Sequence, residues 1–141
     1  RDVTWSDHLT YRTKDLERVK CEATSRTPLI DFILQEGTLE IKGRSIPENS
    51  FAFYQPLNDA LKAYVQSPKE RTTVNIELEY FNTSSAKCLL DFFKALEDAH
   101  GKKTNVTIKW GYQDGDENIL EAGKEYQSML KMNFELVQVA G

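Results

Sequence analysis

The sequence predicts an α/β fold, in which a mixed β-sheet opens with an N-terminal hairpin and continues with helices alternating with strands. Apolar and polar residues alternate in residues 39–42 and 74–79, which is the period of a half-buried strand. Apolar residues recur at helical spacing in residues 53–65 and 89–96. The two kinds of segment alternate along the chain, and this order favours parallel strands joined by right-handed crossovers.

The beginning of the chain is polar and weakly periodic. We treat residues 1–24 as an N-terminal extension of uncertain order, in which "TKDLERVK" is compatible with a short helix or an early strand. Residues 25–141 are predicted to form a single α/β domain. A chain of this length can bury a hydrophobic core without disulfides or metal ions.

The domain opens with the predicted hairpin. Its two strands are "LIDFIL" and "LEIKG", and Gly37 supplies the turn between them. The loop "RSIPENS" follows, and its Asn49 and Ser50 are of the types that begin helices. A helix is then indicated by one apolar stripe: Phe53, Leu57, Leu61 and Val65.

The second half of the domain repeats the alternation of strand and helix. "TTVNIELEYF" is the clearest strand, and a helix is expected from about Ser84, with Gly101 suited to end it. "NVTIKWGY" predicts the next strand. "ENILEAGKEYQSML" predicts a helix that Gly123 weakens, and "FELVQV" predicts a last strand.

Composition excludes several classes of function. The net charge of −4 and the scattered lysines and arginines argue against binding to nucleic acid. Cys21 and Cys88 form no CxxC pair, which favours a reduced, cytoplasmic protein. No apolar run approaches the roughly 18 residues that span a bilayer, so we expect no membrane insertion.

The sequence offers little for catalysis. No Gly-x-Ser-x-Gly elbow and no glycine-rich phosphate loop occurs. Cys88 stands beside Leu89 and Leu90 in a predicted helix, where a buried, inert thiol is the usual finding. We therefore predict no catalytic residue and no cofactor, and keep a small enzyme with a carboxylate or cysteine site as an alternative.

The segment "DGDENILEAGKE" partly matches a calcium-binding loop. Asp114, Asp116, Asn118 and Glu125 fall at the first, third, fifth and twelfth positions of such a loop. The sixth position requires a glycine, and Ile119 stands there. Acidic residues that favour a helix N-terminus explain the segment better, so no metal site is predicted.

The stretch "YFNTSSAK" joins a predicted strand to a predicted helix. Asn82, Thr83 or Ser84 can cap the free N–H groups of that helix. The same geometry exposes a hydroxyl at the carboxyl end of a strand, where a phosphate would meet the positive end of the helix dipole. Thr83 or a neighbouring serine is therefore a candidate for phosphorylation.

Four stretches occur in this order: "RTPLIDF", "GTLEIKGRSIPENSFAFYQPL", "LEYFNTSSAKCLLDFF" and "IKWGYQDGDENILEAGKEY". Together they resemble the SiaC family of bacterial regulatory phosphoproteins, which act in biofilm and second-messenger signalling. The resemblance runs from about Thr27 to Val137. It implies a fold like that of the STAS-type anti-sigma-factor antagonists, which is SpoIIAA-like and places a phosphorylated hydroxyl where a strand meets a helix.

The resemblance also implies a switch and its partners. The phosphorylated residue of the Asn-Thr-Ser-Ser motif is here Thr83. A Ser/Thr kinase of the histidine-kinase-like ATPase type adds the phosphate, and a metal-dependent Ser/Thr phosphatase removes it. The unphosphorylated form binds and activates a diguanylate cyclase, which raises cyclic di-GMP.

We therefore expect a non-enzymatic, partner-switching regulator that phosphorylation controls. Three residues of the switch loop are expected to hold the turn while Thr83 stays available to the kinase: Asn82, Ser84 and Ser85. Further residues are expected to contact the partner: Pro47, Glu48, Asn49 and Lys87. An unmodified structural adaptor is the second alternative, and a phosphate found by intact mass would distinguish the two.

Overall fold

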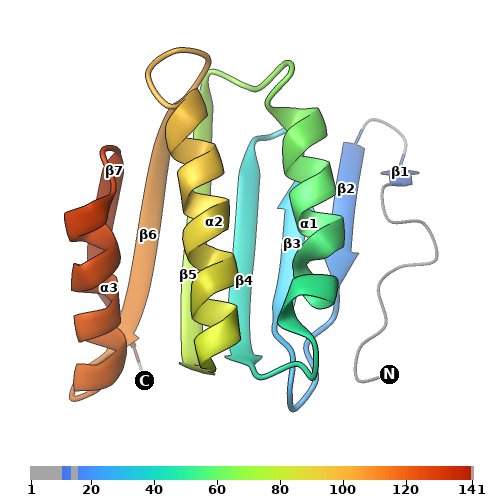
Figure 1. The fold of residues 1–141 in the computed structure, drawn as a ribbon. Helices are drawn as coiled ribbons and strands as arrows, with labels where there is room; N and C mark the ends of the chain where they lie inside the picture. Colours follow the sequence, from blue (N-terminus) through green and yellow to red (C-terminus); the bar gives the residue numbers. More distant parts are fainter. Residues whose placement is uncertain (1–10, 14–15, 141) are drawn as a thin grey trace.

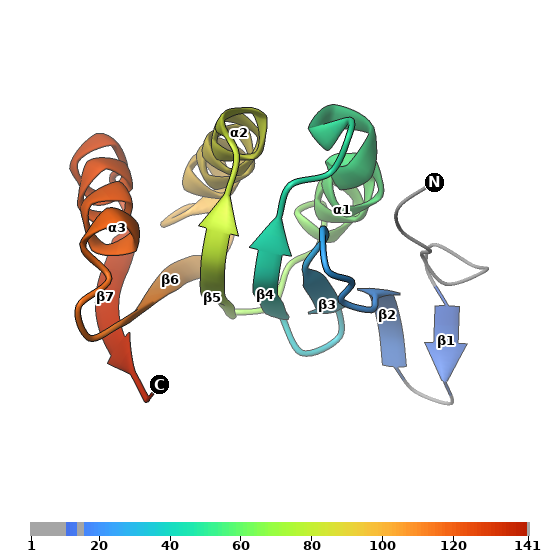
Figure 2. The same cartoon turned by 90° about the horizontal axis from the view of Figure 1, so that it is seen from below.

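A computed structural model describes residues 11–13 and 16–140 of the chain. Their strands form one seven-stranded sheet, in which the spatial order of the strands is their order along the chain. The three helices of the described residues all lie on one face of this sheet (Figures 1 and 2). The predicted α/β class, with helices alternating with strands, is confirmed.

The strands are β1 (Tyr11–Thr13), β2 (Leu16–Cys21), β3 (Leu29–Ile33), β4 (Thr38–Ser45), β5 (Arg71–Phe81), β6 (Asn105–Gln113) and β7 (Asn133–Val139). The helices are α1 (Ser50–Tyr64), α2 (Thr83–Ala99) and α3 (Glu117–Met129). Within the described residues, none of these helices combines the length and the apolar character needed to cross a membrane.

The sheet has an antiparallel half and a parallel half. Strands β1 to β4 pair antiparallel, and strands β4 to β7 pair parallel. The predicted hairpin is β3–β4, and its turn contains Gly37 at a φ of 71°. Strand β2 lies in the segment treated above as an extension and pairs with β3, with Val19 opposite Phe32. The mixed sheet with an opening hairpin is thus as predicted.

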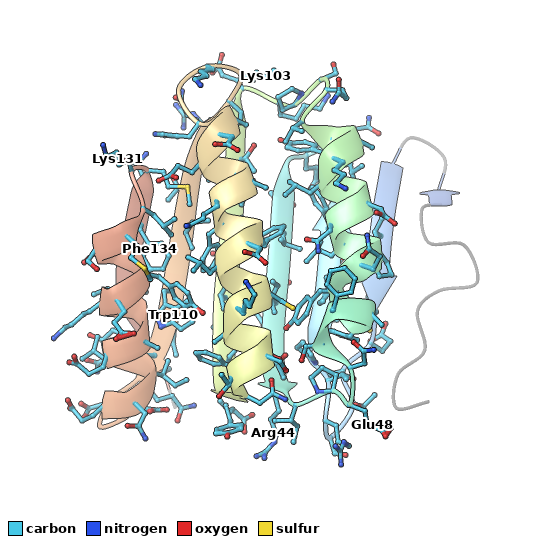
Figure 3. The ribbon with its side chains drawn as sticks, in the orientation of Figure 1. Arg44, Glu48, Lys103, Trp110, Lys131 and Phe134 are labelled. Atoms are coloured by element: carbon cyan, nitrogen blue, oxygen red, sulfur yellow. The ribbon has the colours of Figure 1, made fainter. Side chains whose placement is uncertain are left out.

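The core lies between the helices and the face of the sheet that they cover. Trp110 and Phe134 from the neighbouring strands β6 and β7 stack, with ring centroids 6.2 Å apart. Figure 3 shows both side chains beside α3. The indole Nε1 of Trp110 donates a hydrogen bond of 2.8 Å to the carbonyl oxygen of Ile119, which ties α3 to the sheet.

The helix-free face of the sheet is charged and half-buried. Arg18 donates two hydrogen bonds to Asp31 across strands β2 and β3, at 2.8 and 2.6 Å. Lys42 lies 3.5 Å from Glu40 and 3.6 Å from Glu77, so three neighbouring side chains form an ion-pair group. Glu40 and Glu77 are therefore both paired with the same cation, Lys42.

The right-handed crossovers place the ends of the strands and the starts of the helices at one edge. Strands β4 and β5 end at the lower edge in Figure 1, and helices α1 and α2 begin there. Helix α2 starts at Thr83, one residue before the expected start. We call this edge the carboxyl edge, because the carboxyl ends of the parallel strands form it.

Candidate functional site

The junction of β5 and α2 lies at the carboxyl edge and is built around Asn82. The backbone of Asn82 is extended, with φ −83° and ψ 172°, and its side-chain Oδ1 accepts a hydrogen bond of 2.9 Å from the N–H of Ser85. Its own N–H donates to the carbonyl oxygen of Ser45 at the end of β4, at 3.0 Å. Asn82 is therefore the helix cap, and it also ties the junction to the neighbouring strand.

Helix α1 begins beside this junction with a matching cap. Asn49 Oδ1 accepts a hydrogen bond of 3.0 Å from the N–H of Ala52. Neither α1 nor α2 carries an acidic residue in its first turn. The positive ends of two helix dipoles therefore lie at the same edge without a carboxylate in either first turn to offset them.

A buried group of hydroxyls joins the two helix starts to β4. Ser45 Oγ lies 2.6 Å from Tyr54 Oη and 2.8 Å from Ser85 Oγ. Ser85 is 0% exposed, and its hydroxyl also donates to the carbonyl oxygen of Ser45 at 3.1 Å. We call Ser45, Ser50, Tyr54, Ser84 and Ser85 the hydroxyl cluster. Its members come from β4, α1 and α2, so the cluster fixes how these three elements meet.

Burial keeps the Tyr54 phenol of the hydroxyl cluster uncharged. Desolvation raises the pKa of the Tyr54 phenol well above its ordinary value, although the hydrogen bond with Ser45 acts in the opposite direction. The phenol is therefore protonated at neutral pH and takes part as an O–H group.

The three hydroxyls of the motif have different surroundings. Ser85 is buried in the cluster. Ser84 is exposed, but its Oγ lies 2.7 Å from Ser50 Oγ and donates to Asn82 Oδ1 at 3.2 Å. Thr83 is exposed, and its hydroxyl makes no hydrogen bond to any residue that the structure describes. Phosphorylation of Thr83 stays a prediction, and the structure leaves this residue exposed at the junction.

The residues expected to contact a partner differ in exposure. Pro47 is buried, so its side chain presents little surface to another protein. Glu48 and Asn49 are exposed in the loop before α1, and Figure 3 shows Glu48 at the carboxyl edge. Lys87 is exposed on α2 and lies 3.9 Å from Asp91, one turn along the same helix. Such an exposed pair adds little to stability and leaves the lysine available to a partner.

Two aromatic residues at the carboxyl edge were not singled out from the sequence as exposed. Phe51 in the first turn of α1 is 71% exposed, and Tyr80 near the end of β5 is 52% exposed. Met129, which is 49% exposed, is the third large apolar side chain of this kind in the described residues, and it ends α3 instead. Two of the three thus lie near Thr83, and exposed aromatic side chains are frequent anchors of protein interfaces.

A β-bulge explains why Tyr80 points outward. Strict alternation from Leu78 would turn Tyr80 into the core. The register between β4 and β5 passes from Leu78 directly to Tyr80, so Glu79 is the extra residue. Phe81 consequently points inward, and its ring meets Trp110 edge-to-face at 5.8 Å. The only sequence signal of this bulge lies in the paired strand, where Gly43 stands at the register shift with a φ of 121°.

In the segment that partly matches a calcium-binding loop, Asp116 caps helix α3. Asp116 Oδ1 accepts a hydrogen bond of 3.1 Å from the N–H of Ile119, which begins α3. Ile119 is buried rather than placed in a loop turn. Among the described residues, no three histidine, cysteine or acidic side chains come together in a way that could hold a metal ion.

The cysteines are free and far from their reactive form. Burial raises the pKa of the Cys88 thiol above its ordinary value, and Asp91 adds to this effect. Burial raises the pKa of Cys21 to about 12, with a further contribution from Glu22. A thiolate, the form needed for nucleophilic attack, is therefore disfavoured at both positions.

A hollow of about 710 Å³ lies along the helix-free face of the sheet and reaches the carboxyl edge, where Glu79 and Asp116 contribute to its lining. Lys42, Glu77 and Tyr112 contribute to its lining, and the first two form the ion pair described above. The fold and the carboxyl edge therefore define a small α/β domain whose distinctive site is an exposed strand-to-helix junction flanked by aromatic side chains.

The comparisons with known proteins agree with that description. Residues 21–139 match the model of the SiaC family regulatory phosphoproteins, and the chain belongs to this family. A protein of Pseudomonas aeruginosa strain UCBPP-PA14 is 29% identical over 113 residues, which are 80% of this chain and 90% of that protein.

Two solved structures from Pseudomonas aeruginosa share the fold. SiaC in the crystal structure of the diguanylate cyclase SiaD with its activator SiaC has a TM-score of 0.80 at 28% identity, covering 86% of this chain and 99% of that one. A structure of SiaC by itself has a TM-score of 0.79 at 27% identity, covering 86% and 98% of the two chains. The family predicted from the sequence is confirmed.

Proposed function

We propose that this chain is a non-enzymatic regulator whose unphosphorylated form binds and activates a diguanylate cyclase. The proposal rests on membership of a family of regulatory phosphoproteins and on a homologue that was crystallised as the activator of such a cyclase. A Ser/Thr kinase of the histidine-kinase-like ATPase type and a metal-dependent phosphatase would set the phosphorylation state of Thr83. All of these steps would take place in the cytoplasm.

The observation that carries the proposal is the position of Thr83 at the start of a helix whose first turn has no acidic residue, with exposed aromatic side chains at the same edge. Phe51 and Tyr80 offer apolar area to a partner at the same edge. A phosphate adds about −1.5 to −2 charges. The charge would be stabilised by the start of α2 in the free protein, but a partner would have to desolvate it on docking. Phosphorylation would therefore favour the unbound protein without unfolding it.

The test measures binding to, and activation of, a diguanylate cyclase by variants at position 83. Thr83→Ala should bind and activate as the unmodified chain does, and Thr83→Asp should lose at least tenfold in affinity, because it places a carboxylate at the interface. Ser67→Asp, an exposed serine beyond the other end of α1, is the matched control and should leave both properties unchanged. Equal binding by Thr83→Asp and Thr83→Ala would contradict the proposal.

The aromatic side chains provide a second test of the docking edge. Phe51→Ala and Tyr80→Ala should each weaken cyclase binding by about 1 to 2 kcal/mol, the range for anchor residues. Met129→Ala removes a comparably exposed apolar side chain from the far end of α3 and should have no effect on binding. A loss confined to Met129→Ala would mean that the partner binds elsewhere.

A further inference from the structure

We infer that Ser50 selects the phosphorylated residue, because it holds the hydroxyl of Ser84 and leaves Thr83 as the accessible acceptor of the motif. This inference rests on the proposed function. Ser50 lies 34 residues before Ser84, on a different helix, so it is a positioning residue outside the motif itself.

The question arises because the motif presents consecutive hydroxyls. Thr83 and Ser84 are both exposed in the first turn of α2, and exposure alone does not distinguish them. Ser85 is excluded as an acceptor by its burial. A kinase that approaches the carboxyl edge would therefore meet two candidate hydroxyls on adjacent residues.

Hydrogen bonding distinguishes the two. Ser84 Oγ lies 2.7 Å from Ser50 Oγ, a contact in which either hydroxyl can donate, and 3.2 Å from its acceptor Asn82 Oδ1. The Ser50 hydroxyl lies 3.5 Å from the same Asn82 oxygen. Ser84 Oγ thus has two hydrogen-bond partners within reach, Ser50 and Asn82. Thr83 Oγ1 has none among the residues that the structure describes.

Ser50 is itself held firmly in place. It is 3% exposed, it is the first residue of α1, and its Oγ also lies 3.2 Å from Ser85 Oγ in the hydroxyl cluster. Its hydroxyl cannot turn to solvent, so Ser84 stays bonded as long as α1 stays docked. The restraint on Ser84 is therefore supplied by the packing of α1 against α2.

Phosphoryl transfer needs an acceptor hydroxyl that is free of other hydrogen bonds, and the hydroxyl of Ser84 is not. The acceptor oxygen forms a bond to the γ-phosphorus of ATP, the bond from that phosphorus to the β–γ bridging oxygen breaks, and ADP leaves. The hydroxyl proton passes to a base on the kinase. Ser84 would first have to break its hydrogen bonds to Ser50 and Asn82, whereas Thr83 can enter the reaction directly.

The experiment uses the purified kinase that modifies the wild-type chain, with radiolabelled ATP and peptide mapping by mass spectrometry. The wild type should take one phosphate at Thr83, and Thr83→Ala should react at least tenfold more slowly. The double variant Thr83→Ala with Ser50→Ala should regain phosphorylation, now at Ser84. Adding Ser84→Ala should abolish it again.

Two outcomes would overturn the inference: Ser84 of Thr83→Ala reacting as fast as Thr83 of the wild type, or the double variant remaining unmodified although folded by circular dichroism. A wild type that takes no phosphate at Thr83 would instead remove the proposed function on which the inference rests.

A measurement without any kinase tests the Ser50–Ser84 contact itself. Ser84→Ala should lower the urea midpoint of unfolding, whereas Thr83→Ala should leave it unchanged. Ser50→Ala and Ser84→Ala should be clearly non-additive in a double-mutant cycle, because each removes the same hydrogen bond. Additive midpoints would show that Ser50 does not hold Ser84 and would overturn the inference independently.

Discussion

Two junctions of the same kind, β5–α2 and β6–α3, differ in how they are built. In both, a parallel strand leads to a helix whose cap side chain accepts a hydrogen bond from a backbone N–H. Asn82 accepts from Ser85 in one junction, and Asp116 accepts from Ile119 in the other. The α3 junction adds Glu117 in the first turn, whereas the first turn of α2 has no acid. The α3 start thus carries permanent negative charge, and the α2 start is neutral.

The side-chain contacts that hold the two helices in place also differ. Helix α3 is held by aromatic contacts, among them Trp110 with Tyr126 at 5.3 Å and Phe93 with Tyr126 at 5.1 Å. The start of α2 is held by the hydroxyl cluster, with contacts such as Ser45–Ser85. The comparison shows where an added negative charge would have the larger effect. At the start of α2 it would meet a helix dipole that no acid in the first turn compensates, whereas at the start of α3 it would repeat a charge that is already present.

The largest effect is expected at Gly123, inside α3. Alanine normally stabilises a helix interior by about 1 kcal/mol relative to glycine. A Cβ at Gly123 would lie 2.5 Å from Trp110 Cδ1 and 2.8 Å from Leu136 Cδ2. Gly123→Ala should therefore destabilise the protein by about 2 to 3 kcal/mol in urea unfolding.

Ser128→Ala, at an exposed position of α3, is the control for Gly123→Ala and should stay within about 0.5 kcal/mol of the wild type. A stabilising Gly123→Ala would show that α3 is not seated closely on Trp110. The sequence treats this glycine only as a weak point of a helix, and the structure explains it by the approach of the two elements.

The next effect is alkaline destabilisation through Cys21. Its thiol ionises at a pKa of about 12 in the folded protein and about 9.0 in the unfolded chain. The contribution of this thiol to the free energy of unfolding is therefore fully present below pH 9. It is lost as the pH rises toward 12, because in this range only the unfolded chain releases the proton. At pH 10.5 the loss from this group should be roughly 2 kcal/mol.

Urea unfolding at pH 8 and at pH 10.5 measures this loss. Cys21→Ala should lower stability at both pH values but should show a smaller difference between them. An unchanged difference in that variant would assign the alkaline sensitivity to other groups, of which the buried phenols of Tyr54 and Tyr126 are the first candidates, because burial raises both of their pKa values.

The elements of the fold were predictable because their signals are local. Alternation in β5 and helical spacing in α2 both lie within one segment, and Asn82 announces its own helix. The contacts of the site were not predictable in this way. Ser45 meets Ser85 across 40 residues and Ser50 meets Ser84 across 34, and only the order of strands in the sheet brings them together.

The exposure of the aromatic side chains at the carboxyl edge was also not predictable from local patterns. The outward turn of Tyr80 depends on a bulge that the pairing with β4 creates, and alternation alone predicts the opposite orientation. Phe51 lies outside the apolar stripe of α1, but the sequence does not show that its helix begins at the same edge as the helix of Thr83. Local patterns thus located the junction, whereas the tertiary pairing determined its surroundings.

A smaller effect is expected from the hydroxyl cluster. Ser85→Ala removes the hydroxyl that bonds to Ser45 and Ser50, and it leaves those groups with one partner fewer in a buried site. The cost should be about 1.5 kcal/mol in urea unfolding. Ser128→Ala, which removes an exposed serine hydroxyl, is the matched control. A loss for Ser85→Ala as small as that of Ser128→Ala would mean that the hydroxyl cluster does not hold the junction.

The smallest effects are expected when the charges of the two cap residues, Asn82 and Asp116, are exchanged. Asn82→Asp keeps the acceptor for the N–H of Ser85 and adds negative charge to the uncompensated start of α2, so it should stabilise the protein by about 0.5 kcal/mol at low salt. Asp116→Asn makes the reverse change at α3 and should destabilise by a similar amount. Both effects should fade in 1 M salt, where the Debye length is about 3 Å.

The same two variants also test whether negative charge alone, without a phosphate group, weakens binding to the cyclase. Asn82→Asp places its charge one residue from Thr83, so it should also weaken cyclase binding, by less than Thr83→Asp does, whereas Asp116→Asn should leave binding unchanged. A destabilising Asn82→Asp at low salt would mean that the start of α2 is already compensated. The neutral junction would then lose the property that distinguishes it from its neighbour, and the effect of a phosphate would have to come from shape rather than from charge.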